Sequence, residues 1–309
     1  MTLLFVSKTD DPNRWREMLA CAVPDLEARI WPEIGRAEDI RFALVWKPKP
    51  GILAGLPNLE LIQSLGMGVD HIFLDPDLPA DVPVARLIDD DLVRQMGEHV
   101  LVTALRHHRR IDEYDRLQRD GEWRALAMPD TATTRIGILG LGEIGAPIAG
   151  LLAGLGFAVA GWSRSKKSIE GVESFHGASS LPNFLARTDI LVCLLPLTPA
   201  TENILDKAAF ARLPKGAYLI NLARGLHVVE EDLLAAIESG HMSGAALDVF
   251  RTEPLPTDHP FWLHPRIHVT PHIAGITNPA TAVAQVAENI RRVRAGREPL
   301  NLVDQARGY

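Results

Sequence analysis

Apolar and polar positions alternate along the chain with two different periods. Short runs rich in Val, Ile and Leu are separated by longer segments in which the apolar residues recur at helical spacing. This arrangement is typical of parallel sheets whose strands are joined by crossover helices. A long segment without strand-like runs, from residue 91 to about residue 121, divides the runs into two series. The pattern therefore predicts an α/β protein with two parallel sheets.

The two series give the expected strands. The first series predicts strands at residues 3–7, 28–32, 42–46, 59–66 and 82–87. The second predicts strands at residues 135–140, 157–162, 189–196, 217–223, 244–250 and 267–272. Helices are expected at residues 13–22, 144–155 and 281–296, with one or two more within residues 91–121. The first helix is entered through Asp11 and Pro12, residue types that cap a helix and occupy its first turn.

Length, charge and cysteine content narrow the class of protein. At 309 residues the chain exceeds the usual size of one hydrophobic core, which favours two domains. A net charge of −7 argues against nucleic acid as a partner, since phosphate-backbone binding needs a basic excess. The only cysteines are Cys21 and Cys193, so neither a disulfide framework nor a metal site is expected. The apolar run near Met1 is too short for a signal peptide and no run is long enough to span a membrane, so we expect a cytoplasmic protein.

A glycine-rich run, GLGEIG, provides the first indication of a ligand. Gly140, Gly142 and Gly145 follow a predicted strand and precede a predicted helix. In that context the glycines allow a dinucleotide pyrophosphate to approach the free amides at the helix N-terminus. We therefore predict a dinucleotide site here, with a plain tight turn as the alternative.

The turn after the next predicted strand bears on which dinucleotide is bound. About twenty residues after the glycines, where NAD-binding sequences carry an acidic residue, the chain has the sequence WSRSKK. Ser163, Arg164, Ser165 and Lys167 offer hydrogen-bond donors and positive charge, which suit a ribose 2′-phosphate. This favours NADPH over NADH as cofactor. The alternative is a solvated basic turn without a ligand.

Reactive side chains follow three strands of the second series. Arg224 comes after the run at 217–223, Glu253 after the run at 244–250, and His272 at the end of the last run. Ligands of open parallel sheets bind beyond the carboxyl ends of the strands. We therefore expect these three side chains to meet in one crevice.

Six motifs in this order resemble those of the D-isomer-specific 2-hydroxyacid dehydrogenases, and within them the A-type glyoxylate/hydroxypyruvate reductases. The motifs are GLGEIG, WSRS, LLPLTPAT, INLARG, LDVFRTEPLP and TPHIAG, and the resemblance runs from SLGMGVD at residues 64–70 through the C-terminal helix. It implies a flavodoxin-like substrate domain, residues 1–98 plus 284–309, and a Rossmann nucleotide-binding domain, residues 99–283, with an interdomain cleft. It also implies a homodimer joined through the nucleotide domain.

The resemblance assigns roles to residues within the matching motifs. The catalytic arginine, glutamate and histidine are implied at Arg224, Glu253 and His272. The substrate is expected to contact Arg224 and His272, together with residues of the first domain: Trp46, Met67, Gly68 and Val69. Besides the glycines and the basic turn, the cofactor is expected to contact Glu143, Ile144, Leu195, Pro196, Thr201, Ala223 and Asp248.

The chemistry of keto-acid reduction fits these residue types. Hydride transfer to the carbonyl carbon leaves an alkoxide, and its protonation requires a general acid such as His272. Glu253 would orient the imidazole and stabilise its protonated form, and the fork of Arg224 would hold the substrate carboxylate and carbonyl.

Several of these assignments have structural alternatives. Glu253 can be a turn residue before a proline, Asp248 a strand-end cap, and Trp46 a packed core indole. Met67 is larger than the residue that many relatives carry in this loop, which bears on pocket size and on the choice of keto acid.

The function expected from the sequence is NADPH-preferring reduction of a small 2-keto acid, such as glyoxylate to glycolate or hydroxypyruvate to D-glycerate. Two alternatives use the same scaffold. One is a dinucleotide-sensing binding protein of the corepressor kind, and the other is an NAD-linked oxidative dehydrogenase of the formate or phosphite type. The joint presence of Arg224, Glu253 and His272 argues against a purely binding role, and the basic turn argues against the NAD-linked alternative.

Overall fold

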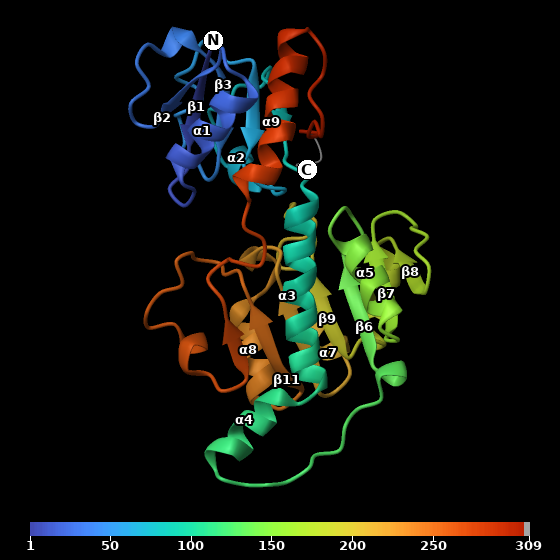
Figure 1. Cartoon of the computed structure of the whole chain (residues 1–309). Coiled ribbons are helices and arrows are strands. Elements are labelled where there is room, and N and C mark those ends of the chain that lie inside the picture. The colour runs from blue at the N-terminus through green and yellow to red at the C-terminus, as the bar shows by residue number, and fades with distance from the viewer. Residues whose placement is uncertain (306–309) are drawn as a thin grey trace. The chain divides into compact units, whose positions relative to one another are not determined.

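The computed structural model describes residues 1–305, which fold as two compact units (Figure 1). The first comprises Met1–Leu92 and the chain from Thr277 onward, and the second is the continuous stretch Val93–Ile276. The domain boundaries expected from the sequence, after residues 98 and 283, lie six residues (98 − 92) and seven residues (283 − 276) further along the chain. Each unit is described by itself below.

The first unit is built on a five-stranded parallel sheet in the order β2-β1-β3-β4-β5. This order is that of flavodoxin-like folds. Its central strand β1 is buried on both faces: Leu3 and Phe5 belong to one apolar cluster, and Leu4 and Val6 to the other. The strands are β1 (Thr2–Val6), β2 (Glu27–Ile30), β3 (Ile40–Val45), β4 (Leu61–Ser64) and β5 (Val84–Ala85).

Two helices cover one face of this sheet and pack against each other, although they come from opposite ends of the chain. Helix α1 (Pro12–Ala22) begins as predicted, because the Asp11 carboxylate accepts hydrogen bonds from Asn13 N and Arg14 N at 3.0 and 3.3 Å. Helix α9 (Pro279–Arg294) is capped in the same way by Asn278. Short helices at α2 (Asp70–Phe73) and η1 (Ala37–Asp39) complete the unit.

The second unit is built on a seven-stranded parallel sheet in the order β12-β11-β10-β9-β6-β7-β8. Six of these strands follow the Rossmann order, which reverses direction between β6 and β9, and β12 extends the sheet beyond β11. The strands are β6 (Arg135–Leu139), β7 (Ala158–Ser163), β8 (Val172–His176), β9 (Ile190–Cys193), β10 (Ala217–Asn221), β11 (Met242–Leu247) and β12 (Ile267–Val269). Together with the first sheet, this arrangement confirms the predicted fold class.

The segment that separates the two strand series forms two helices, α3 (Asp90–His108) and α4 (Ile111–Arg119). The chain turns between them at Arg110, which adopts a left-handed φ of 58°. The other α-helices of the second unit are α5 (Gly145–Gly154), α6 (Leu181–Ala186), α7 (Lys207–Arg212) and α8 (Glu230–Glu238). Single turns of 3₁₀ helix occur at η2 (Thr131–Thr133), η3 (Ala178–Ser180), η4 (Gly225–His227) and η5 (Pro260–Leu263).

One strand of the second sheet is absent from the sequence prediction. Strand β8, with the sequence VESFH, is half-exposed and pairs with β7 at the edge of the sheet. A strand at an edge buries little surface, so Glu173 and Ser174 are tolerated and the run does not stand out as apolar. The sequence interpretation also assigned no separate helices to α6, α7 and α8, whose short lengths give weak periodicity.

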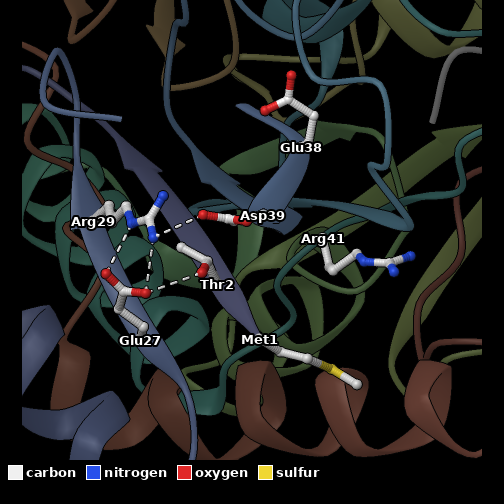
Figure 2. A pocket seen from close by; sticks show the side chains of 7 residues that line it. All are labelled: Met1, Thr2, Glu27, Arg29, Glu38, Asp39 and Arg41. Carbon is white, nitrogen blue, oxygen red and sulfur yellow. Dashed lines mark hydrogen bonds and ion pairs between the residues drawn. The ribbon is translucent and has the colours of Figure 1, made fainter. Parts of the chain in front are cut away.

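A polar hollow lies at the amino ends of the strands in the first unit and includes none of the predicted site residues (Figure 2). Arg29 there donates to Glu27 and Asp39, and Thr2 Oγ1 donates to Glu27 at 3.2 Å. Arg29 is thus already paired with two carboxylates of the hollow, while Arg41 pairs with Glu60 outside it. Parallel sheets bind their ligands at the opposite, carboxyl edge.

Residues 1–305 contain neither a candidate membrane span nor a candidate metal cluster. No helix in this range is long and apolar enough to cross a membrane. Within the same range, no group of three or more His, Cys, Asp or Glu side chains is placed to hold a metal ion.

Candidate active site

The glycine run lies at the carboxyl end of β6, where the second sheet reverses its strand order. Gly140 has a φ of 101°, which favours glycine, and Gly145 begins helix α5. A Cβ on Gly145 would lie 1.8 Å from Gly140 O, so the strand and the helix can approach this closely only without a side chain. The run thus adopts the strand, turn and helix predicted for it.

Gly142 differs from the other two glycines, because a Cβ built on it would meet no protein atom within 4 Å. Gly142 and Glu143 are exposed and Ile144 is half-buried, directly before the N-terminus of α5. Packing within residues 1–305 therefore does not demand a glycine here. A ligand whose phosphates approach the backbone closely would require a glycine here. This is the role of the second glycine in dinucleotide sites.

The basic turn follows β7, which pairs with β6, so it lies at the same sheet edge as the glycines. Ser163 is buried and its hydroxyl donates to Ser165 O at 2.7 Å, which fixes the start of the turn. Arg164, Ser165 and Lys167 are exposed. The turn therefore presents its donors and charges at the same sheet edge as the glycine turn.

The predicted cofactor contacts after β9 form a compact turn. Thr201 Oγ1 donates to Pro196 O at 2.8 Å and accepts from Thr198 N at 2.8 Å. Leu195 is buried and Pro196 is exposed. Thr201 holds the shape of this turn, while Pro196 lies on its accessible side.

Arg224 follows β10 and is held through its backbone by two buried polar residues. Asn221 Nδ2 donates to Arg224 O at 3.0 Å, and Asn221 Oδ1 accepts from the N–H of the buried Ala223 at 3.2 Å. His227 Nδ1 lies 3.2 Å from Arg224 N and 3.1 Å from Arg224 O, and its Nε2 lies 3.3 Å from Pro196 O. These bonds fix the turn that presents the half-buried guanidinium.

Glu253 and His272 come from the ends of β11 and β12 and form a hydrogen-bonded pair. The distance from His272 Nδ1 to Glu253 Oε2 is 2.9 Å, with both side chains about three-quarters buried. The other oxygen, Glu253 Oε1, accepts from Phe250 N at 3.2 Å. Because a carboxylate only accepts, Nδ1 carries a proton and Nε2 is the nitrogen that can exchange one with a substrate.

Asp248 lies directly after β11 and is 1% exposed. Its carboxylate accepts hydrogen bonds from Thr270 Oγ1, Ile273 N and Ala274 N at 2.6 to 2.9 Å. These bonds cap the strand end next to His272.

The predicted substrate residues of the first unit lie at the ends of β3 and β4. Trp46 is half-buried and packs edge-on against His71, with ring centroids 4.4 Å apart. A Cβ on Gly66 would lie 2.7 Å from the Trp46 ring, so the indole rests directly on that glycine. Met67 and Gly68 are half-buried, and Val69 is in the core, which leaves only its backbone for a ligand. The indole thus serves in packing and also borders the loop.

Two residues of this site were not predicted from the sequence. Asn221 and His227 are both 0% exposed and hold the Arg224 turn from either side. Asn221 interrupts the apolar run AYLINLA, and a polar residue inside a buried strand is a signal that could have identified it. His227 has no comparable signal, because its partner Pro196 comes from a different strand end.

Comparisons with known proteins agree with this architecture. The sequence profile of the NAD-binding domain of D-isomer specific 2-hydroxyacid dehydrogenases matches residues 101–274, which lie within the second unit. Glyoxylate/hydroxypyruvate reductase A of Yersinia enterocolitica is 44% identical, with both proteins covered over their full lengths.

Solved structures are similar over the same extent. A D-isomer specific 2-hydroxyacid dehydrogenase from Xanthobacter autotrophicus Py2, in complex with NADPH and MES, is 47% identical with a TM-score of 0.95, covering 100% of this chain and 99% of its own. The NADPH-dependent glyoxylate/hydroxypyruvate reductase of Sinorhizobium meliloti, in complex with NADP and sulfate, is 39% identical with a TM-score of 0.93, covering 100% of each chain. The chain therefore belongs to the D-isomer specific 2-hydroxyacid dehydrogenase family of NAD(P)-dependent oxidoreductases.

Proposed function

We propose that the protein is an NADPH-preferring reductase of small 2-keto acids, with glyoxylate and hydroxypyruvate as its substrates. The observation that carries this proposal is the Glu253–His272 pair at the carboxyl edge of a dinucleotide-binding sheet. An imidazole held by a carboxylate is an arrangement for proton transfer. The similarity to glyoxylate/hydroxypyruvate reductases over the whole chain supports the choice of substrate.

The preference for NADPH rests on the turn after β7. Exposed Arg164 and Lys167 stand at the position where an acidic residue would repel a 2′-phosphate. Similar proteins solved with NADPH or NADP support the same choice. The open space at Gly142 fits the pyrophosphate of this cofactor. When bound, NADPH supplies the hydride for the reaction.

The side chains of the protein then have distinct tasks. His272 donates a proton from Nε2 to the carbonyl oxygen as the carbonyl carbon is reduced, and the product is a 2-hydroxy acid. Glu253 holds the ring through Nδ1 and stabilises the imidazolium before the transfer. The planar guanidinium of Arg224 binds the substrate carboxylate and carbonyl in a fixed fork, which Lys would not reproduce.

The loop at Met67–Val69 and the indole of Trp46 complete the proposed substrate site. Backbone amides in this loop are proposed to donate hydrogen bonds to the other side of the substrate carboxylate, and Trp46 is proposed to limit the length of the keto acid. The support for this is local: the loop follows β4 and the indole follows β3, so both lie at the carboxyl edge of the first sheet.

We further propose a homodimer formed through the second unit, and a cytoplasmic setting. Apolar side chains are exposed on α3, on α5 and the residue after it, and on the segment after α4: Val102, Leu105, Leu151, Leu155, Trp123 and Met128. A contiguous apolar surface on a globular protein marks an interaction site. Free thiols at Cys21 and Cys193 are compatible with a reducing compartment.

The proposal is tested by the rate of nicotinamide oxidation with purified protein. Glyoxylate, hydroxypyruvate and pyruvate are each assayed with NADPH and with NADH, and the same series is run on His272→Ala. We expect turnover of a two- or three-carbon keto acid with a clear NADPH preference. His272→Ala should reduce kcat by about 10² to 10⁴, the range for loss of a general acid.

Three outcomes would contradict parts of the proposal. Tight NADPH binding without turnover of any of the three acids would favour the dinucleotide-sensing alternative. Faster reaction with NADH would reject the role of the basic turn. Wild-type kcat in His272→Ala, with the protein folded, would remove His272 from the mechanism.

A further inference from the structure

We infer that Asp248 is a positioning residue, whose buried carboxylate fixes the backbone turn that presents His272 to the substrate. This inference rests on the proposed function, since it assumes that His272 is the general acid. It goes beyond the cofactor contact expected from the sequence, because the bonds that the structure shows for this carboxylate go to residues around His272.

The register of the sheet brings Asp248 beside the turn. Strands β11 and β12 are parallel neighbours in which Leu247 pairs with Val269. One residue later, Asp248 and Thr270 therefore leave the sheet side by side, and Thr270 N donates to Leu247 O at 3.0 Å. The chain then turns through Pro271 and reaches His272 within two residues.

The main chain and the side chain of Asp248 hold this turn together. Its carbonyl oxygen accepts from His272 N at 2.8 Å. Its Oδ1 accepts from Thr270 Oγ1 at 2.6 Å and from Ile273 N at 2.9 Å, and its Oδ2 accepts from Ala274 N at 2.8 Å. One residue thus binds the chain before, at and after His272. Hydrogen bonds to a charged group are about twice as strong as neutral ones.

The backbone of His272 needs such support. Its φ is 56°, in the left-handed region that a residue with a Cβ occupies only at a cost. Conformations of this kind persist when the surroundings over-determine them, and they cluster at functional sites. Here the surroundings are the amides that Asp248 binds on the C-terminal side of His272.

The link between Asp248 and catalysis is therefore geometric. Without the carboxylate, the turn is free to relax and the imidazole shifts relative to Glu253 and to the substrate. A misplacement of about 1 Å can cost about 10²-fold in rate even when every reacting group is present.

The test is a double-mutant cycle with Asp248→Asn and His272→Ala. The Asn side chain keeps the shape and can still accept at one atom, but its NH₂ group faces either Ala274 N or the pair Thr270 Oγ1 and Ile273 N. We expect kcat with glyoxylate and saturating NADPH to fall about tenfold in the wild-type background. In the His272→Ala background, Asp248→Asn should change kcat less than twofold, because residues that act as a unit are non-additive.

Two further variants keep the inference testable. Thr270→Val removes one donor and should reproduce part of the loss, about threefold, if Asp248→Asn does not fold. The matched control is Asp189→Asn, which removes a carboxylate that accepts from Arg135 N at 3.0 Å at the amino end of the same sheet. It should lower Tm and leave kcat within twofold of wild type.

The following results would overturn the inference. Equal loss of kcat in both backgrounds would mean that Asp248 acts independently of His272. A higher Kd for NADPH, with kcat at saturating cofactor unchanged, would return it to the role of a cofactor contact. A lower Tm with normal kcat would make it a structural cap only. Wild-type kcat in His272→Ala alone would instead reject the proposed function, a result recognised without any Asp248 variant.

Discussion

The Nδ1 atom of His272 lies 2.9 Å from Glu253 Oε2, and this contact determines which ring nitrogen can act on a substrate. Arg224 is fixed in a comparable way, because Asn221 and His227 hold its backbone while its guanidinium is presented. At the scale of single residues, neighbouring polar side chains thus hold the ring of His272 and the backbone of Arg224 in place. Arg224, Glu253 and His272 were predicted from the sequence, and Asn221 and His227 were not.

Replacement of Arg164 by Ala tests the cofactor preference. The side chain is exposed on the turn after β7, and its loss would remove the charge-assisted hydrogen bonds proposed to a 2′-phosphate. NADPH should bind about tenfold to a hundredfold more weakly, while the Kd for NADH stays within about twofold of wild type. Fluorescence titration of both cofactors measures the two constants.

The matched control for this change is Arg212→Ala, an exposed arginine in the last turn of α7. It removes one positive charge from the same unit without touching the basic turn. Equal weakening for the two cofactors in Arg164→Ala, or an equal effect of Arg212→Ala on NADPH, would refute a phosphate contact at Arg164.

His107 provides a prediction about stability and pH. Its ring stacks on Tyr218 with centroids 4.1 Å apart, and burial lowers the pKa of His107 to about 4, against an ordinary value of 6.5. Between these values the unfolded chain binds a proton that the folded chain does not, so stability falls as the pH falls from about 6.5 to about 4. From pH 7 to pH 5 this amounts to about 2 kcal/mol.

The measurement is the free energy of unfolding in urea at pH 7 and pH 5 for wild type and for His107→Phe. The phenyl ring can keep the stacking on Tyr218 but does not titrate. The variant should therefore lose less stability between the two pH values than wild type does. An identical loss in both proteins would mean that His107 is not the group responsible.

At the scale of elements, strand β6, the glycine turn and helix α5 contain one glycine that packing requires and one that it does not. Gly145→Ala would place a Cβ 1.8 Å from Gly140 O, so we expect a lower Tm or no folded protein. Gly142→Ala meets no protein atom within 4 Å, so Tm should stay near that of wild type. Its NADPH affinity should fall about tenfold, because the added methyl group would lie where the phosphates approach.

Thermal unfolding and NADPH titration of these two variants separate packing from binding. A Gly142→Ala protein that binds NADPH like wild type would contradict the placement of the pyrophosphate at this turn. Normal stability of Gly145→Ala would contradict the close approach of strand and helix.

The buried strands and the helix with a recognisable cap were predicted, whereas the strand at the edge of the second sheet was not. The buried strands β1, β6 and β10 were identified because burial on both faces demands a continuous apolar run. Strand β8 was missed because it lies at an edge, where exposed and buried positions are mixed. The helix expected at residues 13–22 was found because its cap, Asp11, is itself visible in the sequence.

At the scale of the whole molecule, the exposed apolar surface on the second unit gives a prediction about assembly. Leu105, Met128 and Leu155 line one hollow of about 460 Å³, and Val102 lies one helical turn from Leu105 on α3. We expect a homodimer, with a mass twice the 33.9 kDa of one chain, in size-exclusion chromatography with light scattering. Val102→Asp combined with Leu155→Asp should give monomers, because burying two unpaired charges is costly.

The matched control is Leu263→Asp, whose side chain is 94% exposed in η5 of the same unit. It should leave the dimer intact. A monomeric wild type would refute the dimer, and dissociation by Leu263→Asp alone would place the interface elsewhere.

The sequence by itself determined the fold class, the two strand series and the motif residues, because burial of strands and the close approach of backbones restrict residue types locally. It also placed Arg224, Glu253 and His272 at the ends of successive strands. Only the tertiary structure decided how these side chains are held. The order and register of β11 and β12 bring Asp248 beside the turn at His272, and the neighbouring ends of β9 and β10 bring Pro196 to His227. Both contacts join residues that are distant along the chain, so they leave no periodic trace in the sequence.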